Sequence, residues 1–529
     1  MLGVFDKTGQ FIKSHKGKWG FVLTVFLGTL AALSLPPYPL TPLYYIGLGL
    51  ALILMIQTER PREAFLLGLA FGFGYFGLGI SWVGQSFLAQ SDVPHWSAPI
   101  AVFFLVVYLS LFPAAAFMVA RKLMPKNWGA RAFVFAAVFS AFELARGIIG
   151  SIGFPWNTAS SVWWPVDEIV QSVAIFGSYG LGLMTLLTVG LFAPLFDDKA
   201  PKTSRLGLPL AASALLGLFF LSGWIRLEGA VVTNHEGVTL RLVQANIPQL
   251  EKWDPEFLRR NFDRHVSLST AGVTKNGGPT HIIWPETAIP YDVGNDQGLR
   301  DYLAGSLGPD RTLISGATRI ETEGTPRIYN SIYSLGGDGE ILDIYDKVHL
   351  VPFGEYVPFR AVLGQIGLDT LVAGTLDYSS GAGLKTVTLP GLPPFSPLIC
   401  FEIIFSGQVV GDGPAPEWLL NVTNDAWFGN SSGPYQHYEL ARMRAIEQGI
   451  PVVRAAGTGI SSVIDPFGRT VEKLDLGTSG FLDVQLPKAL STRTIFSNYG
   501  NYPFFILLVI FSIFGIFLRP FSRPEKKLF

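Results

Sequence analysis

The chain has 529 residues, of which 15% are charged and 13% aromatic, and its formal net charge is −1. Typical globular domains carry roughly 25% charged residues, so this composition argues against a wholly soluble protein, and the length allows two or more domains. The basic residues fall in short clusters between apolar runs, a pattern that fits membrane topology better than a nucleic-acid surface.

Charge divides the chain into two kinds of segment. Residues 227–500 hold 20 Lys and Arg against 30 Asp and Glu, whereas the remainder holds 19 and 10. We therefore predict a membrane domain of about seven transmembrane helices at 1–226, a polar domain at 227–500, and a transmembrane helix with a tail at 501–529. The single cysteine, Cys400, excludes an intrachain disulfide and does not identify the compartment.

Apolar segments long enough to cross a bilayer as helices follow a polar, basic start. They lie near 20–36, 41–57, 64–84, 98–120, 130–149, 167–196, 206–226 and 502–518. Basic residues cluster in alternate connections, while the intervening connections carry at most Arg146. The positive-inside rule then places both termini in the cytoplasm and the 227–500 domain on the other side of the membrane.

Several features of the predicted helices go beyond hydrophobicity. The glycine repeat at 71–79 would let another helix approach closely. Glu143 and Arg146 lie one turn apart near the outer end of the 130–149 segment, where they either serve function or pair to fix helix packing. Trp156 lies in the outer connection that follows, as an interfacial anchor or as part of a lipid-binding rim.

Residues 227–500 mix apolar strands with amphipathic helices. Strands are expected near 238–246, 281–284, 311–317, 329–335, 341–345, 396–400, 418–422, 451–455 and 461–464. Helices are expected near 254–271, 296–307 and 434–448. Apolar strands alternating with helices indicate a layered α/β fold with buried sheets.

Three residues at or near the ends of expected strands can form one acyl-transfer site. Glu286 follows the 281–284 strand, Lys347 follows 341–345, and Cys400 ends 396–400. A thiol attacks as thiolate and needs a proton acceptor, which a buried carboxylate supplies. A lysine ammonium and a backbone N–H stabilise the resulting oxyanion. Taken singly, each residue has a structural alternative: a core thiol, a turn carboxylate or a solvated ion pair.

The combination of motifs resembles the nitrilase superfamily and its Glu-Lys-Cys signature. The residues that carry this resemblance are Trp284-Pro285-Glu286, Asp346-Lys347, Phe353-Gly354-Glu355 and Cys400-Phe401-Glu402. Together with the multi-span segments, the stretches 243–253, 284–290, 329–331 and 351–358 resemble the apolipoprotein N-acyltransferase family of Gram-negative bacteria.

The resemblance implies a multi-span α-helical membrane domain plus a four-layer αββα nitrilase-like sandwich facing the periplasm from the bacterial inner membrane. It implies the last step of lipoprotein maturation, in which a phospholipid donates an acyl chain to the cysteine. The thioester then acylates the α-amino group of an apolipoprotein's diacylglyceryl-cysteine. The expected partners are the phospholipid, the apolipoprotein and the bilayer, with no nucleic acid. A monomer is expected, without cofactor or metal.

By position in those motifs, the resemblance makes Cys400 the nucleophile and Glu286 the general base. Lys347 and the Phe401 N–H would stabilise the oxyanion, while Glu355 would orient Lys347 or the acyl carbonyl. The alternative for Glu355 is a plain turn carboxylate. Family members often carry Tyr directly after the nucleophile, so any role of that hydroxyl is absent here or met elsewhere.

The remaining candidates support the triad or contact substrate. Glu402 is placed with the supporting residues, and Trp253 would line the mouth of the site, with simple packing as its alternative. The other candidate substrate-binding residues are Asn330, Trp156, Glu143 and Arg146. The apolar stretch 356–368 is expected to be a lid that touches lipid or an ordinary buried loop.

Two other functions remain open at this stage. A membrane-tethered amidase or nitrile hydrolase would use the same triad with water as the second nucleophile. A lipoprotein-binding scaffold would carry a degenerate site. The number of apolar segments argues against the first, because one span suffices as a tether, and the presence of all three core residues argues against the second.

Overall fold

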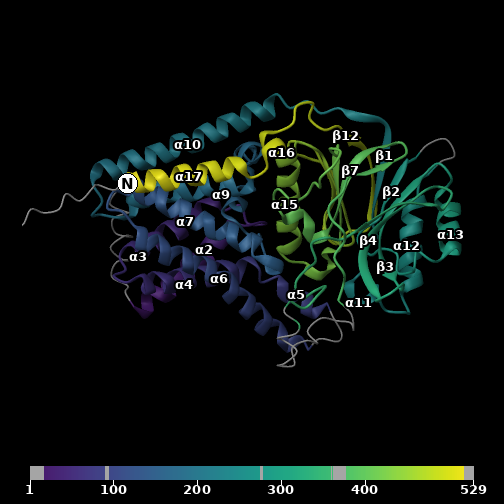
Figure 1. Ribbon diagram of the computed structural model, residues 1–529, viewed down its shortest axis with the longest axis horizontal. Helices are drawn as coiled ribbons and strands as arrows, with labels where there is room; N and C mark the ends of the chain where they lie inside the picture. Colours follow the sequence, from purple (N-terminus) through teal and green to yellow (C-terminus); the bar gives the residue numbers. More distant parts are fainter. Residues whose placement is uncertain (1–16, 90–93, 274–277, 359, 361–376, 518–529) are drawn as a thin grey trace, which may run out of the picture.

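The computed structural model describes residues 17–89, 94–273, 278–358, 360 and 377–517. A helical part and an α/β part lie side by side, and the final helices return to the helical part (Figure 1). Most of the 356–368 stretch lies outside the described residues, so the prediction of a lid stays a prediction.

The helical part forms a membrane domain. Its helices are α2 (Lys18–Ala32), α3 (Thr41–Ile56), α4 (Pro61–Gly79), α5 (Val83–Leu88), α6 (Ala98–Leu123), α7 (Trp128–Ile148), α8 (Asp167–Val170), α9 (Val173–Phe192) and α10 (Lys202–Glu228), joined later by α16 (Ile495–Tyr499) and α17 (Tyr502–Phe517).

Length and composition single out some of these helices as membrane spans. Among the described residues, four helical segments are long and apolar enough to cross a bilayer: His95–Leu123, Trp128–Ile148, Val173–Phe196 and Lys202–Glu228. Shorter apolar helices cover Lys18–Ala32, Thr41–Ile56 and Tyr502–Phe517. The α10 helix leaves most of its large apolar side chains exposed, as expected of a surface that faces lipid.

The predicted close approach of helices at the glycine repeat is confirmed. A Cβ atom on Gly74 would lie 2.0 Å from the carbonyl oxygen of Val25 in α2. A Cβ atom on Gly72 would lie 2.7 Å from Cγ of Pro113 in α6. The small residues of α4 therefore let two helix backbones approach on either side.

The α/β part contains two six-stranded sheets. One has the order β12-β1-β2-β3-β4-β5 and the other β11-β10-β9-β8-β7-β6. The first sheet contains β1 (Asn234–Gln244), β2 (His281–Ile283), β3 (Thr312–Glu321), β4 (Arg327–Leu335), β5 (Ile341–Asp346) and β12 (Gly480–Pro487). The second contains β6 (Val387–Leu389), β7 (Leu392–Ile399), β8 (Trp418–Thr423), β9 (Val452–Ala456), β10 (Ser461–Ile464) and β11 (Thr470–Leu474).

Helices cover the outer face of each sheet, which gives the predicted αββα sandwich. The first sheet is covered by α12 (Leu258–Thr270) and α13 (Gln297–Leu307), with the short α11 (Gln249–Lys252) nearby (Figure 1). The helix α15 (Gly433–Gln448) lies on the second sheet, between it and the membrane domain (Figure 1). Apolar side chains from both sheets, including Leu242, Ile332 and Leu420, share one buried core between the layers.

A buried polar cluster joins α15 to the membrane domain. Ser178 of α9 donates from both its backbone N–H and its hydroxyl to Glu447 Oε1, each at 2.7 Å. Arg444 pairs with the other oxygen of the same carboxylate at 2.7 Å. All three side chains are buried, so this contact holds the α/β part to a fixed part of the helical domain.

Candidate active site

The nucleophile candidate lies at a strained turn. The strand β7 ends at Ile399, and Cys400 begins a short 3₁₀ helix with φ of 52°. Its position at the strand end was predicted, but its left-handed backbone was not. A non-glycine residue in this region is strained by about 1–3 kcal/mol, so the surrounding structure must hold it there.

Two side chains hold the backbone of this turn. The carbonyl oxygen of Cys400 accepts hydrogen bonds from His437 Nε2 at 3.1 Å and from Asn421 Nδ2 at 3.3 Å. Because a carbonyl can only accept, Nε2 of His437 must carry a proton. Burial, reinforced by Arg454, lowers the pKa of His437, against the opposing effect of Asp425, which lies 3.0 Å from Nδ1 of the ring.

The two supporting side chains are themselves fixed by a buried ion pair. Arg454 Nη2 lies 2.7 Å from Asp425 Oδ2, and both side chains are fully buried. Burial raises the pKa of Asp425, but Arg454 and His437 outweigh it and hold that pKa well below its usual range. Arg454 also donates to Asn421 Oδ1, so one guanidinium orients the network behind the nucleophile.

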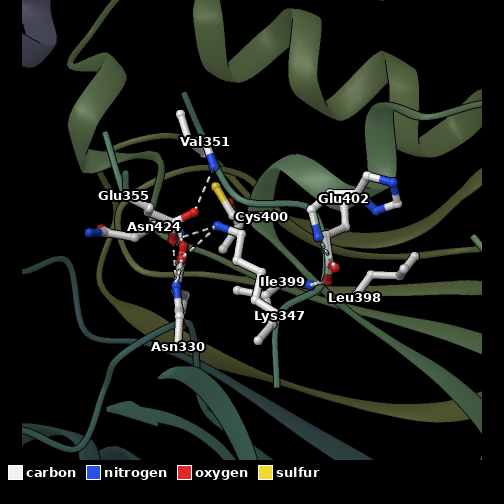
Figure 2. Close-up of polar contacts among 12 residues, drawn as sticks. Asn330, Lys347, Val351, Glu355, Leu398, Ile399, Cys400, Glu402 and Asn424 are labelled. Carbon is white, nitrogen blue, oxygen red and sulfur yellow. Dashed lines mark hydrogen bonds and ion pairs between the residues drawn. The ribbon is translucent and has the colours of Figure 1, made fainter. Parts of the chain in front are cut away.

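The predicted lysine lies beside the thiol (Figure 2), and the predicted base lies next to that lysine. Lys347 Nζ is 3.6 Å from Glu286 Oε1 and 2.9 Å from Glu355 Oε1. Asn330 Nδ2 donates to both carboxylates, at 2.7 Å to Glu286 and 3.0 Å to Glu355. The backbone N–H of Asn424 donates to the other oxygen of Glu286 at 2.8 Å. These bonds fix both carboxylates around one ammonium.

The electrostatics of the site suit a protonated thiol with a base and a permanent cation close by. Burial raises the pKa of the Cys400 thiol, Glu286 raises it further, and Lys347 lowers it. Burial by itself lowers the pKa of Lys347, but Glu355 and Glu286 outweigh it and raise that pKa above its ordinary value. The thiol therefore stays protonated until a base takes its proton, and Lys347 stays charged throughout.

Glu402 joins two strand ends. Its carboxylate accepts the backbone N–H groups of Ile399 (2.7 Å), Val348 (2.8 Å) and His349 (3.0 Å), together with the Tyr345 hydroxyl. Burial raises the pKa of Glu402 to about 7. The carboxylate thus positions the ends of β5 and β7, which carry Lys347 and the thiol (Figure 2).

Phe401 faces the membrane domain. Its ring stacks on Phe154 with centroids 6.1 Å apart, and it packs edge-on against Phe405 at 5.1 Å. The Phe401 side chain is thus packed among other rings. Its backbone N–H remains beside the thiol, next in the chain to Cys400.

Trp156, Glu143 and Arg146 lie outside the triad, in the membrane domain. Arg146 Nη1 donates to the carbonyl oxygens of Phe154 and Trp156, at 2.7 and 2.6 Å. Glu143 Oε1 accepts from the backbone N–H of Ala159 at 3.0 Å. The two charges therefore fix the connection after α7, whose Phe154 contacts Phe401.

The remaining candidates differ in their surroundings. Trp253, with 45% of its surface exposed, follows α11 next to Lys252, whereas Trp156 is buried and donates to Gln436 Oε1 at 2.8 Å. The described residues contain no group of three or more His, Cys, Asp or Glu side chains placed to hold a metal ion.

Some residues of the site escaped prediction from the sequence. They are Lys252, Asn421, Asn424, Asp425, His437 and Arg454. A signal was present in β8, where Asn421 interrupts an otherwise apolar strand and polar residues follow it. A buried polar residue within an apolar run usually has a specific hydrogen-bond partner.

Two known domain families match the chain. Residues 27–191 match the apolipoprotein N-acyltransferase N-terminal domain, and residues 239–496 match the carbon-nitrogen hydrolase family. The apolipoprotein N-acyltransferase of Rhodopseudomonas palustris is 36% identical over 93% of this chain and 94% of its own length. That of Bradyrhizobium diazoefficiens is 37% identical over 99% of this chain and 100% of its own length.

Solved structures resemble the α/β part. A CN-hydrolase superfamily protein from Xanthomonas campestris has a TM-score of 0.35 and 19% identity, covering 47% of this chain and 90% of that protein. A nitrilase-superfamily amidase from Nesterenkonia has a TM-score of 0.34 and 18% identity, covering 49% of this chain and 94% of the amidase.

Proposed function

Because the chain belongs to the apolipoprotein N-acyltransferase family, we propose that it transfers an acyl chain from a phospholipid to the α-amino group of an apolipoprotein's diacylglyceryl-cysteine. The reaction proceeds in two half-reactions through a thioester on Cys400. The observation that supports this proposal most directly is the grouping of Glu286, Lys347 and Glu355 at the end of the strand that carries the thiol.

In the first half-reaction, Glu286 takes the proton of the thiol, and the thiolate attacks the ester carbonyl of the phospholipid. Lys347 Nζ and the Phe401 N–H stabilise the negative charge that develops on the carbonyl oxygen. The C–O bond of the ester breaks, Glu286 returns its proton to the departing alkoxide, and a lysophospholipid leaves. The acyl chain remains on Cys400 as a thioester.

In the second half-reaction, the neutral α-amine of the apolipoprotein attacks the thioester. Glu286 takes a proton from the attacking nitrogen, and the C–S bond breaks. The proton then returns to the thiolate, which restores Cys400. Glu355 holds Lys347 in place during both steps through its 2.9 Å contact with Nζ.

The membrane domain delivers both lipid substrates. An acyl chain gains roughly 0.8 kcal/mol per CH₂ in an apolar medium, so both substrates stay in the bilayer. We place the 227–500 domain in the periplasm and both termini in the cytoplasm, with the enzyme acting as a monomer. The connection after α7, which carries Phe154 and Trp156, forms the rim between bilayer and thiol.

The test follows the acyl group. Purified protein is incubated with acyl-labelled phospholipid, and a hydroxylamine-sensitive label on the protein is expected from wild type but not from Cys400→Ala. Adding a diacylglyceryl peptide with a free α-amine should move the label into a hydroxylamine-resistant amide, while an N-acetylated peptide should leave it on the protein. Labelling of Cys400→Ala would contradict the thioester. Release of labelled fatty acid with no transfer to peptide would identify a hydrolase instead.

A further inference from the structure

A second lysine lies beside the triad, and the mechanism above does not use it. Lys252 ends α11, and its Nζ donates to the backbone carbonyl oxygen of Glu286 at 2.9 Å. The same ammonium lies 3.2 Å from the side-chain amide of Asn424. Since the Asn424 N–H also bonds the Glu286 carboxylate, Lys252 holds the general base through two routes.

The ammonium borders a small polar cavity. Lys252, Glu286 and Asn424 line a space of about 20 Å³, which is enough for roughly one water molecule. Within the described ranges, no carboxylate forms an ion pair with Lys252: Glu286 and Glu355 pair with Lys347, and the adjacent Glu251 pairs with Arg260. The positive charge of Lys252 is therefore not matched to one carboxylate, and it influences all the charged groups nearby.

The net charge of the carboxylates and lysine around the thiol indicates a role for the ammonium of Lys252. Two carboxylates, Glu286 and Glu355, share Lys347 as their direct ion-pair partner. With both ionised, these three groups carry one net negative charge, and that net charge stays the same when the thiol proton moves to Glu286 and Cys400 becomes a thiolate. Uncompensated buried charge is costly, and the ammonium of Lys252 brings the resting site to neutrality.

The titratable groups that act on Lys252 are Glu286 from the end of β2, Cys400 from the end of β7 and His265 from α12. Burial lowers the pKa of Lys252 to about 8, against the opposing effect of Glu286 and Cys400. Burial also lowers the pKa of His265 to about 4, so that ring is neutral near pH 7. Lys252 is thus the group in this set that changes charge just above neutral pH.

We propose that Lys252 is a positioning residue whose ammonium keeps Glu286 aligned and offsets the negative charge of the site, and thereby promotes formation of the Cys400 thiolate in both half-reactions. The proposal rests on the proposed acyl transfer, but its direct consequence is chemical reactivity of the thiol. Below about pH 8 the charge is present and supports the thiolate, and as pH rises through that value the support is lost.

The test measures alkylation of Cys400 by iodoacetamide between pH 6 and pH 10. Because Cys400 is the only cysteine, alkylation of the intact protein reports this thiol alone. At pH 7, Lys252→Arg should react at the wild-type rate, whereas Lys252→Met should react about tenfold more slowly, as expected for the loss of one nearby charge. Above pH 9 the wild type should converge on Lys252→Met, while Lys252→Arg keeps its advantage.

A purely structural role would give a different pattern. Equal alkylation rates for wild type and Lys252→Met across the pH range would overturn the proposal, as would a Lys252→Arg profile that follows the wild type above pH 9. Thermal unfolding of each variant checks the fold, and if Lys252→Met does not fold, the comparison of Lys252→Arg with wild type decides. The assay uses no phospholipid, so failure of the proposed function would show separately as absence of thioester in the wild type.

Discussion

Replacing Glu355 by glutamine tests whether this carboxylate holds Lys347 in the position that the proposed reaction requires. Its Oε1 accepts from Lys347 at 2.9 Å and from Asn330 at 3.0 Å, and its Oε2 accepts from the Val351 N–H at 2.8 Å. All three partners donate. A glutamine has only one acceptor oxygen, so either Val351 or the Lys347–Asn330 pair would face an NH₂ group.

The size of the effect follows from the bonds that are lost. A hydrogen bond to a charged group contributes about 1.5–3 kcal/mol, and Glu355 is only 12% exposed, so solvent screens little of this. If the transition state loses one such bond to Lys347, the rate of thioester formation falls roughly 10- to 100-fold. Glu355→Asp keeps both oxygens on a shorter side chain and should fall between the glutamine variant and wild type.

The assay is the initial rate of hydroxylamine-sensitive labelling from acyl-labelled phospholipid. Glu323→Gln, at an exposed position between β3 and β4, is the matched control and should label at the wild-type rate. Thermal unfolding of both variants separates a loss of rate from a loss of folded protein. A Glu355→Gln protein that is folded and labels within threefold of wild type would refute the assigned role of this carboxylate.

Three further perturbations follow from buried charge and close packing. Asp425→Asn leaves Arg454 as a buried charge without its carboxylate, so the free energy of unfolding should fall by about 3–5 kcal/mol, measured by thermal unfolding. Gly74→Leu should destabilise the protein in the same assay, whereas Gly77→Leu should not, because a Cβ atom at position 77 meets nothing within 4 Å. Glu402 ionises near pH 4.5 when unfolded but has a pKa of about 7 when folded, so its contribution to stability is full below pH 4.5 and is lost by pH 7. The difference in unfolding temperature between wild type and Glu402→Gln should therefore shrink between pH 5 and pH 8.

The parts that the sequence could predict are those with a local signature. Glu286 and Lys347 follow apolar runs and Cys400 ends one, and these runs form β2, β5 and β7. The strand β12 has an equally local signal, because Leu482, Val484 and Leu486 alternate with polar residues, yet it was not among the predicted strands. The strand β11 is almost wholly exposed and offers no apolar pattern to find.

Contacts between distant parts of the chain could not be predicted. The expected strand at 396–400 included Cys400, but its positive φ ends the strand one residue earlier. That φ depends on His437, which lies 37 residues further on. Glu143 and Arg146 were weighed as a mutual pair, whereas their hydrogen bonds go to backbone atoms of the connection after α7, whose path is set only by folding.

The backbone strain in the site has a common physical origin. Thr287, Phe353 and Cys400 all have positive φ, and they lie respectively beside Glu286, two residues before Glu355, and at the thiol itself. Glu286, Glu355 and Cys400 thus lie at or close to turns that an isolated peptide would avoid. The tightly bonded sheets and the buried hydrogen bonds behind them stabilise these turns against relaxation.

Hydrogen bonds also join the membrane domain to the strained turn that carries Cys400. Gln436 of α15 accepts from the indole N–H groups of Trp82 and Trp156, at 3.1 and 2.8 Å, and the next residue in the helix, His437, bonds the Cys400 carbonyl oxygen. The helix α15 therefore contacts the connection after α7 through Gln436 and the strained turn at Cys400 through His437. A displacement of that connection would leave the buried indole N–H of Trp156 unpaired, at a cost of about 1–3 kcal/mol. The position of the thiol relative to the helical domain is fixed by these hydrogen bonds, not by the length of a linker.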